Sequence, residues 1–279
     1  MKKIVIKIGT STLTHAESGE LNLRWIQILS RTVADLQNTG NQVVIVTSGA
    51  VCVGLTNLNV YDFAGFKSRT RGQNLRQPAQ NAKIDFSTTQ KQAAAAIGQV
   101  ELMNIYRDTF AGYNKLIAQI LLTRTALEAE LSARHAKNTM NLLLENGIIP
   151  IINANDSVDS NEIEFGDNDT LSAQVASLID ADLLVILTDT EGLYNADPHK
   201  NPHVMLIPHV SKITSEIKQL ASAMPGDAGK GGMATKILAA EIAISNGFDM
   251  IIASGKTPEI LYQIMEGEQV GTYFGKKRL

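Results

Sequence analysis

Cysteine is almost absent from the sequence, because Cys52 is the only one among 279 residues. A single cysteine cannot form a disulfide within the chain, nor can it supply the paired ligands of a cysteine zinc site. The sequence also lacks any run of 18 apolar residues, so it holds no pattern of a membrane-spanning helix. Its N-terminus lacks the long apolar run of a signal peptide, since Lys7 follows only three apolar residues. We therefore expect a cytoplasmic protein with no membrane partner.

Excess charge of one sign is also missing. The chain has 25 Lys and Arg against 28 Asp and Glu, which gives a formal net charge of −3. Proteins that bind nucleic acid depend on clustered basic residues, so no nucleic-acid partner is expected. Aromatic residues make up 5% of the chain, hydrophobic residues 44% and charged residues 19%, a balance typical of globular proteins. At roughly 150 residues per domain, the length allows two small domains or one large one.

Short apolar runs rich in Ile, Val and Leu recur along the chain at the length of buried strands. They occupy residues 4–8, 43–46, 116–122, 148–152, 183–187 and 250–253. Apolar residues at helical spacing lie between them, at residues 26–36, 140–144, 171–178 and 237–244. Continuous apolar strands that alternate with helices indicate an α/β fold with a mostly parallel sheet, covered by helices on both faces.

Two segments interrupt this alternation. Residues 155–166 are too polar for a core element, so we expect a hairpin or an excursion beside the sheet. Residues 59–91 hold six Lys and Arg against two acidic residues. This basic segment fits a solvated insertion, and a basic lid or a subunit-contact arm is the alternative.

The turns that follow the predicted strands are rich in glycine, hydroxyl and amide side chains. They lie at residues 7–11, 47–50, 153–156 and 188–192. In an open parallel sheet the ligand crevice lies beyond the carboxyl ends of the strands. Turns of this kind that lead into helices expose backbone N–H groups, which bind phosphate or carboxylate. Four such turns predict one crevice that binds anions.

Three charged residues fit a phosphoryl-transfer site, which needs positive charge around the migrating group and an acid to orient it. Lys7 lies inside an apolar strand, where an unpaired ammonium would be costly; exposure at a strand edge is the alternative. Asp169 lies at a helix start, where plain capping is the alternative. Lys236 follows a glycine-rich loop, residues 229–235, whose backbone can approach a polyphosphate closely. Residues 226–230 do not match a P-loop, because the spacing of their glycines differs from that of the motif.

Several ordered segments of the sequence together resemble the amino acid kinase family and, within it, the glutamate 5-kinases. They are residues 7–11, 46–50, 152–156, 165–172, 187–189, 192–194 and 231–236. The resemblance covers nearly the whole chain, from Lys3 to Phe274. It implies a three-layer αβα sandwich, with one amino acid kinase domain over residues 1–279 and without the C-terminal PUA domain of many members. The N-terminal part would bind mainly the amino acid, and the C-terminal part mainly ATP.

The resemblance also implies a reaction. The γ-phosphoryl group of ATP, bound with Mg²⁺, would pass to the side-chain carboxylate of L-glutamate in the first step of proline biosynthesis. Two other functions stay open: phosphorylation of another acceptor by a related kinase, and a non-catalytic module that binds nucleotide or amino acid. A carboxylate acceptor is already ionised at neutral pH, so this chemistry needs no general base.

Site residues follow from the resemblance by position. Lys7 and Lys236 would stabilise the transferring phosphoryl group, and Asp169 would hold both lysines in place. The glutamate site would comprise Ser48, Asn153, Asp156, Asp167 and Asn168. The nucleotide site would comprise Lys7, Thr188, Asp189, Lys230, Gly231, Gly232, Met233, Ala234, Thr235 and Lys236. The resemblance implies no protein ligand for the metal.

Partners and regulation follow from the resemblance as well. It implies a homo-oligomer, either a dimer or a tetramer, a glutamyl phosphate reductase that consumes the product, and proline as a feedback inhibitor. The sequence departs from the family pattern in three places. Ala154 stands where the family often has an acid, Lys230 stands where a threonine is usual, and the basic segment 59–91 is longer than its counterpart.

Overall fold

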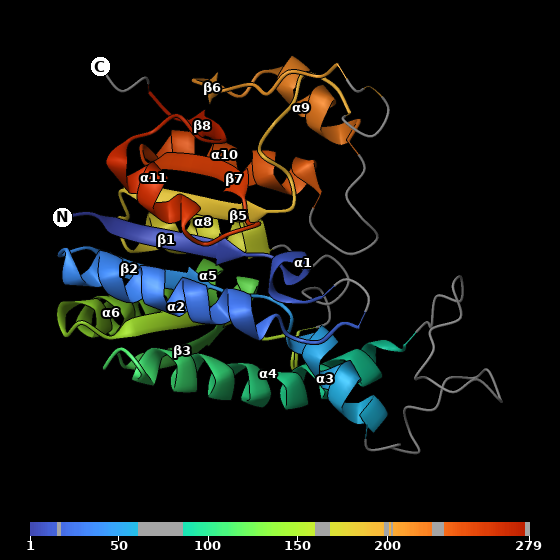
Figure 1. Cartoon of the computed structure of the whole chain (residues 1–279), viewed down its shortest axis with the longest axis vertical. Coiled ribbons are helices and arrows are strands. Elements are labelled where there is room, and N and C mark those ends of the chain that lie inside the picture. Colours follow the sequence, from blue (N-terminus) through green and yellow to red (C-terminus); the bar gives the residue numbers. More distant parts are fainter. Residues whose placement is uncertain are drawn as a thin grey trace.

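An eight-stranded sheet runs through the part of the chain that the computed structural model describes, which comprises residues 1–15, 18–60, 86–159, 168–197, 201, 203–224 and 232–276. The strands lie side by side in the order β3 (Ile117–Leu122), β4 (Ile149–Ala154), β2 (Gln42–Val46), β1 (Lys3–Ile8), β5 (Leu183–Thr188), β7 (Asp249–Ser254), β8 (Thr272–Phe274) and β6 (His209–Val210). Neighbouring strands are parallel except for β7 and β8, which pair antiparallel (Figure 1). The predicted mostly parallel sheet is confirmed.

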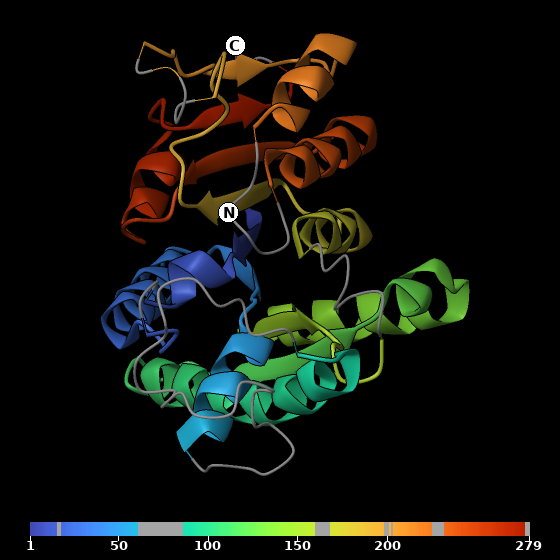
Figure 2. The same cartoon turned by 90° about the vertical axis from the view of Figure 1, so that its right-hand side faces the viewer.

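Helices cover both faces of this sheet. One face carries α6 (Glu130–Glu145), α8 (Asn168–Leu178), α9 (Ser215–Ser222) and α10 (Met233–Asn246). The other carries α2 (Leu23–Asn38), α4 (Thr88–Ala111) and α11 (Ile260–Glu266). Figure 2 shows α2 and α11 on one side of the strands and α8 and α10 on the other. Three layers therefore stack as helices, sheet and helices, as the sequence predicts.

Three further helices lie at the carboxyl-terminal edge of the sheet. They are α1 (Thr10–Leu13), α3 (Ala50–Val60) and α5 (Arg124–Glu128), which follow β1, β2 and β3. Because parallel strands end at the same edge, the turns after β1, β2, β4 and β5 come together there. This edge lies on the right of Figure 1, where α1 and α3 are labelled.

Alternation along β1 decides which layer each of its side chains meets. Ile4, Ile6 and Ile8 pack with the helices of the α2 face, and Val5 packs with those of the α8 face. Side chains alternate between the two faces of a strand, so Lys7 points to the same face as Val5. That face is covered by α8, which carries Asp169, and by α10, which carries Lys236.

Two glycines set the close crossing of α3 and α4. A Cβ atom on Gly98 of α4 would lie 1.9 Å from the carbonyl oxygen of Ala50, and one on Gly54 of α3 would lie 1.8 Å from that of Ala94. No side chain fits at such distances, so only glycine permits this contact. The crossing brings the buried face of α4 close to the ends of β2 and β4.

The strand and helix predictions are confirmed for β1, β2, β3, β4, β5 and β7 and for α2, α6, α8 and α10. The sequence pattern does not predict β6 and β8, which have only two and three residues. None of the helices in the described ranges is long and apolar enough to cross a lipid bilayer.

Both interrupting segments lie partly outside the described residues. Residues 61–85 and 160–167 are not among them, so the expected lid or arm and the expected excursion remain predictions. The boundaries 59–91 are wrong at both ends, because α3 extends to Val60 and α4 begins at Thr88.

A capping box between Ser87 and Gln90 begins α4. The Ser87 hydroxyl accepts a hydrogen bond from the Gln90 backbone N–H, and the Gln90 side chain accepts one from the Ser87 backbone N–H.

Candidate active site

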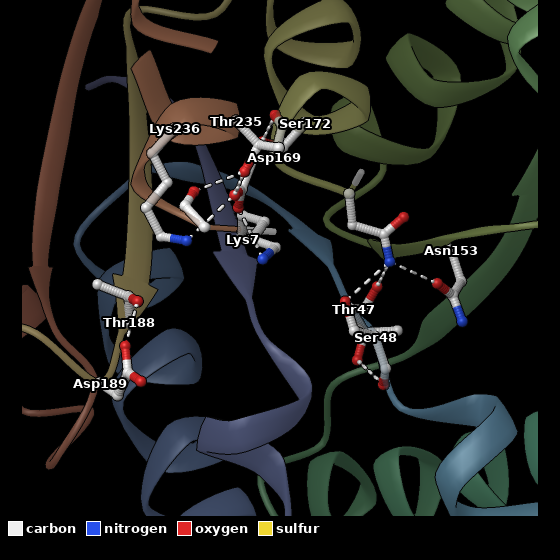
Figure 3. Close-up of polar contacts among 12 residues, drawn as sticks. Lys7, Thr47, Ser48, Asn153, Asp169, Ser172, Thr188, Asp189, Thr235 and Lys236 are labelled. Atoms are coloured by element: carbon white, nitrogen blue, oxygen red, sulfur yellow. Dashed lines mark hydrogen bonds and ion pairs between the residues drawn. The ribbon is translucent and has the colours of Figure 1, made fainter. Parts of the chain in front are cut away.

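Three charged side chains from three elements meet at the carboxyl-terminal edge of the sheet. The ammonium of Lys7, in β1, lies 2.7 Å from Oδ1 of Asp169 in the first turn of α8. The ammonium of Lys236, in α10, lies 3.2 Å from Oδ2 of the same carboxylate. The side chains are 9%, 1% and 8% exposed for Lys7, Asp169 and Lys236 respectively. The structure thus brings together the three residues that the sequence predicts to be catalytic (Figure 3).

The Asp169 carboxylate is held from several directions. The Thr235 hydroxyl donates to its Oδ2 at 2.8 Å, and the Ser172 hydroxyl donates to the Asp169 backbone carbonyl at 2.6 Å. Burial by itself raises the pKa of this carboxyl group. The positive charges of Lys7 and Lys236, with hydrogen bonds from Lys7 and Thr235, outweigh burial and lower the pKa to about 2. Asp169 is therefore ionised at neutral pH and orients two cations.

The cluster of Lys7, Asp169 and Lys236 carries a net positive charge in a region with little water. A low local dielectric strengthens the attraction between such a cluster and an anion. Both lysines lie where phosphate groups would approach from the strand ends. The arrangement fits stabilisation of a phosphoryl group during transfer, which requires fixed positive charge and no proton acceptor.

A network of amides lies beside this cluster. Nδ2 of Asn168, the residue before Asp169, donates to the Thr47 carbonyl at 2.9 Å, the Ser48 hydroxyl at 2.8 Å and Oδ1 of Asn153 at 3.1 Å. Gly49, with φ at +96°, closes the turn that presents Ser48. Three of the predicted glutamate-site residues, Ser48, Asn153 and Asn168, are thereby in direct contact.

Helix α4 supplies two further members of this network that the sequence analysis did not identify. Oε1 of Gln99 accepts from Nδ2 of Asn153 at 2.9 Å. The Tyr106 hydroxyl lies 3.0 Å from the Thr47 hydroxyl, and burial raises the pKa of this phenol well above its usual range. Gln99 and Tyr106 share the buried face of α4 with Leu102 and Phe110. A lone glutamine on an otherwise apolar helix face is the signal that could have identified Gln99.

Thr188 ends β5, and Asp189 follows it, on the other side of the lysine cluster. The Thr188 hydroxyl donates to Oδ1 of Asp189 at 2.9 Å, with Thr188 buried and Asp189 exposed. Figure 3 places this pair on one side of Lys7 and the pair of Ser48 and Asn153 on the opposite side. The site therefore has two arms that meet at the lysine cluster.

Some of the remaining predicted site residues are among those that the structure describes, and others are not. Asp156 lies half-buried in the turn after β4. Met233, Ala234 and Thr235 form the first turn of α10, and Gly232 precedes it without any side-chain cap, so backbone N–H groups at this helix end are free of helical partners. Such a helix start fits an anionic phosphate. Asp167, Lys230 and Gly231 lie outside the described residues.

The described residues offer no protein site for a resident metal ion. They contain no group of three His, Cys, Asp or Glu side chains that could hold one. Asp169, the one carboxylate at the centre of the site, is occupied by Lys7, Lys236 and Thr235. Mg²⁺ commonly binds to proteins through phosphate oxygens of the nucleotide with few protein ligands, so this donor set fits Mg²⁺ that enters with ATP.

Comparison with known proteins identifies the family. The profile described as the amino acid kinase family matches residues 2–254. The chain belongs to the amino acid kinase family. Glutamate 5-kinase from Clostridium perfringens is 44% identical over 281 residues, which covers 99% of this chain and 96% of that protein. Glutamate 5-kinase from Clostridium tetani is 45% identical over 274 residues, which covers 98% and 94%.

Among solved structures, this amino acid kinase resembles the crystal structure of UMP kinase from Bacillus anthracis. The TM-score is 0.61 at 14% sequence identity, and the match covers 99% of this chain and 97% of that one. At this identity the likeness concerns the fold alone. It supports the three-layer α/β architecture that the sequence predicts.

Proposed function

We propose that this protein transfers the γ-phosphoryl group of ATP to the γ-carboxylate of L-glutamate, which yields L-glutamyl 5-phosphate, the first intermediate of proline biosynthesis. The observation that carries this proposal is the placement of two buried lysines, Lys7 and Lys236, on the two oxygens of Asp169. Relatives named glutamate 5-kinase, 44% and 45% identical over nearly the whole chain, support the choice of glutamate as acceptor.

The chemistry follows from charge and alignment. An oxygen of the γ-carboxylate attacks the γ-phosphorus of ATP, the bond from that phosphorus to the bridging oxygen breaks, and ADP leaves. Lys7 and Lys236 stabilise the charge on the phosphoryl oxygens, and Asp169 keeps both ammonium groups in position. Mg²⁺ bound to the nucleotide offsets further phosphate charge. The acceptor carboxylate carries no proton at neutral pH, so no side chain has to act as a base.

The two arms of the site suit the two substrates. Thr188, Asp189 and the start of α10, from Met233 to Lys236, would bind the nucleotide, with Lys230, Gly231 and Gly232 contributing from the preceding loop. Ser48, Asn153, Asp156, Asp167 and Asn168 would bind glutamate, with Asp156 as the partner of the α-ammonium. Transfer then takes place between the arms, at the lysine cluster.

An assay with hydroxylamine tests this function, because hydroxylamine converts an acyl phosphate into a coloured hydroxamate. The protein is incubated with ATP, Mg²⁺ and either L-glutamate, N-acetylglutamate or L-aspartate. We expect hydroxamate with L-glutamate and little with the other two. A different preferred acceptor would identify a related kinase, and no product from folded protein that binds ATP would favour a non-catalytic binding module.

We also propose the wider setting of the enzyme. The product is an acyl phosphate that water destroys, so a reductase that accepts it directly, a glutamyl phosphate reductase, is the fitting consumer. A single kinase domain over residues 1–279, a cytoplasmic location, a homo-oligomer and inhibition by proline are proposed from the family resemblance. Light scattering of the purified protein tests the oligomer, and an assay with added proline tests the inhibition.

A further inference from the structure

Gln99 of α4 lies in the amide network beside the lysine cluster, and none of the roles above requires it. Its side chain is buried, with only 7% of the residue exposed. Oε1 accepts from Asn153 at 2.9 Å. Nε2 exposes less than 1 Å² and has no hydrogen-bond partner among the described residues. A buried donor without a partner is uncommon in folded proteins and calls for an explanation.

Backbone groups fix the direction of every amide in this network. The Ala154 backbone N–H can only donate, and it donates to Oδ1 of Asn153 at 2.9 Å. Asn153 must then turn Nδ2 toward Gln99, so Gln99 presents Oε1 and turns Nε2 away. The Thr47 carbonyl can only accept, and it accepts from Nδ2 of Asn168. The Oδ1 atom of Asn168 is thus left as a buried acceptor without a partner among the described residues.

The network therefore ends in one unused donor and one unused acceptor. An amino-acid head group needs both, because its carboxylate accepts hydrogen bonds and its ammonium donates them. The reacting γ-carboxylate must lie at Lys7 and Lys236. Asn168 is adjacent in sequence to Asp169, and its amide donates to Ser48 and Asn153, in the arm proposed to bind glutamate. The far end of the substrate then meets the amide network.

We infer that Nε2 of Gln99 donates to the α-carboxylate of the amino-acid substrate, while Oδ1 of Asn168 accepts from its α-ammonium. This inference rests on the proposed function. It makes Gln99 a specificity-determining residue that recognises a free α-carboxylate. Because Nε2 is covered in the structure, the contact requires the substrate to displace the groups that cover it. The close crossing at Gly54 and Gly98 holds this part of α4 against α3, the helix that follows β2.

Two substitutions separate a direct contact from simple support of Asn153. Gln99→Met removes both the acceptor and the donor at similar volume. Gln99→Glu keeps an oxygen that accepts from Asn153 but replaces the donor by a second oxygen. If Gln99 contacts the α-carboxylate, both variants should lose about 100-fold in kcat/KM for L-glutamate, with Gln99→Glu at least as impaired. The KM for ATP should stay unchanged. Wild-type behaviour of Gln99→Glu would overturn the inference and leave Gln99 as a positioning residue for Asn153.

A truncated substrate completes the test. 4-Aminobutyrate is L-glutamate without its α-carboxylate, so its use by the enzyme should not depend on the Gln99 donor. The ratio of kcat/KM for L-glutamate to that for 4-aminobutyrate should fall at least 10-fold in Gln99→Met. An unchanged ratio would overturn the inference. Gln119→Met is the matched control, because Gln119 is exposed on the edge strand β3, and it should keep the wild-type ratio.

Two further controls protect the result. Wild-type protein must form hydroxamate from L-glutamate; if it does not, the proposed function fails, whereas a failure confined to the Gln99 variants concerns this inference alone. If the variants do not fold, NMR of the wild-type protein provides the test. The signals to follow are those of the side-chain amides of ¹⁵N-labelled glutamine. L-Glutamate should shift one buried, slowly exchanging glutamine amide and 4-aminobutyrate should not; equal shifts, or none, would overturn the inference.

Discussion

The Lys7 ammonium lies 2.7 Å from Oδ1 of Asp169, at the point where the first strand of the chain meets the first turn of α8. The pair is almost fully buried, and Lys236 occupies the other carboxylate oxygen. A buried carboxylate between two lysines gives little net stability by itself, because all three charges lose their hydration. We propose that its function is to hold two positive charges at fixed positions for the phosphoryl group.

Asp169→Asn should lower kcat roughly 100-fold or more, because the lysines lose the charge that orients them. It should also lower the free energy of unfolding by about 3 kcal/mol, since two buried cations lose their counter-charge. A folded domain usually has about 5 kcal/mol or more to lose, so the variant should still fold. Turnover in the hydroxamate assay and urea denaturation measure the two effects.

The matched control for this variant is Asp180→Asn. Asp180 pairs with Lys137 at 2.7 Å, but its side chain is 75% exposed. Exposed ion pairs contribute less than about 1 kcal/mol, so stability and kcat should stay close to those of the wild-type protein. Equal losses of turnover in the two variants would contradict the role given to Asp169.

The low pKa of Asp169 also predicts how stability depends on pH. The folded-state pKa of about 2 lies below the ordinary value of 3.8, so ionised Asp169 stabilises the fold above pH 4, and this contribution is lost as the pH falls toward 2. The shift corresponds to about 2 kcal/mol. Urea denaturation between pH 5 and pH 2 should therefore show a steeper loss for the wild-type protein than for Asp169→Asn. Parallel curves would show that this carboxyl group does not titrate below its ordinary range.

Asp156→Asn should raise the KM for L-glutamate about 10-fold or more, because a neutral amide attracts the α-ammonium less than a carboxylate does. The KM for ATP should not change, since Asp156 lies in the turn after β4, in the arm proposed to bind glutamate. Asp159→Asn makes the same change in charge three residues later and serves as the control. A selective rise in the KM for ATP would refute the assignment.

Gly98→Ala should destabilise the protein by about 2 kcal/mol or more, because its Cβ would meet the Ala50 carbonyl oxygen at 1.9 Å. The forced separation of α3 and α4 should also move Gln99 and raise the KM for L-glutamate. Gly112→Ala is the control at the end of the same helix, where the added Cβ finds its nearest neighbour at 3.5 Å. Urea denaturation and steady-state kinetics of both variants provide the comparison, and equal stability would show that the crossing tolerates a methyl group.

Much of this site could be predicted from the sequence for physical reasons. A lysine inside an apolar strand needs a buried anion, and the alternation of side chains in β1 directs Lys7 to the face of α8 and α10. The glycine and hydroxyl turns after the parallel strands predict the crevice edge. Ser48, Asn153 and Asn168 do meet there, although the sequence could not show which of their amide atoms face each other.

Other features depend on packing between distant elements. Gln99 lies in α4, which begins at Thr88 within the basic segment 59–91. The crossing at Gly54 and Gly98 packs this helix against α3, and Gln99 meets Asn153 there. No local sequence pattern could predict that Gln99 and Asn153 lie within hydrogen-bond distance of each other. The strands β6 and β8 are two and three residues long. They form because β7 offers an edge to β8, and β8 in turn offers an edge to β6.

The central claim is that a γ-carboxylate oxygen of glutamate attacks the γ-phosphorus of ATP. L-Glutamate labelled with ¹⁸O in the γ-carboxylate tests it most directly, with ATP, Mg²⁺ and hydroxylamine present. Hydroxylamine attacks the acyl carbon and expels phosphate with the oxygen that had joined the two groups. We predict that each phosphate released carries one ¹⁸O atom, as seen by mass spectrometry. Unlabelled phosphate would contradict the account, because the attacking oxygen would then have come from water.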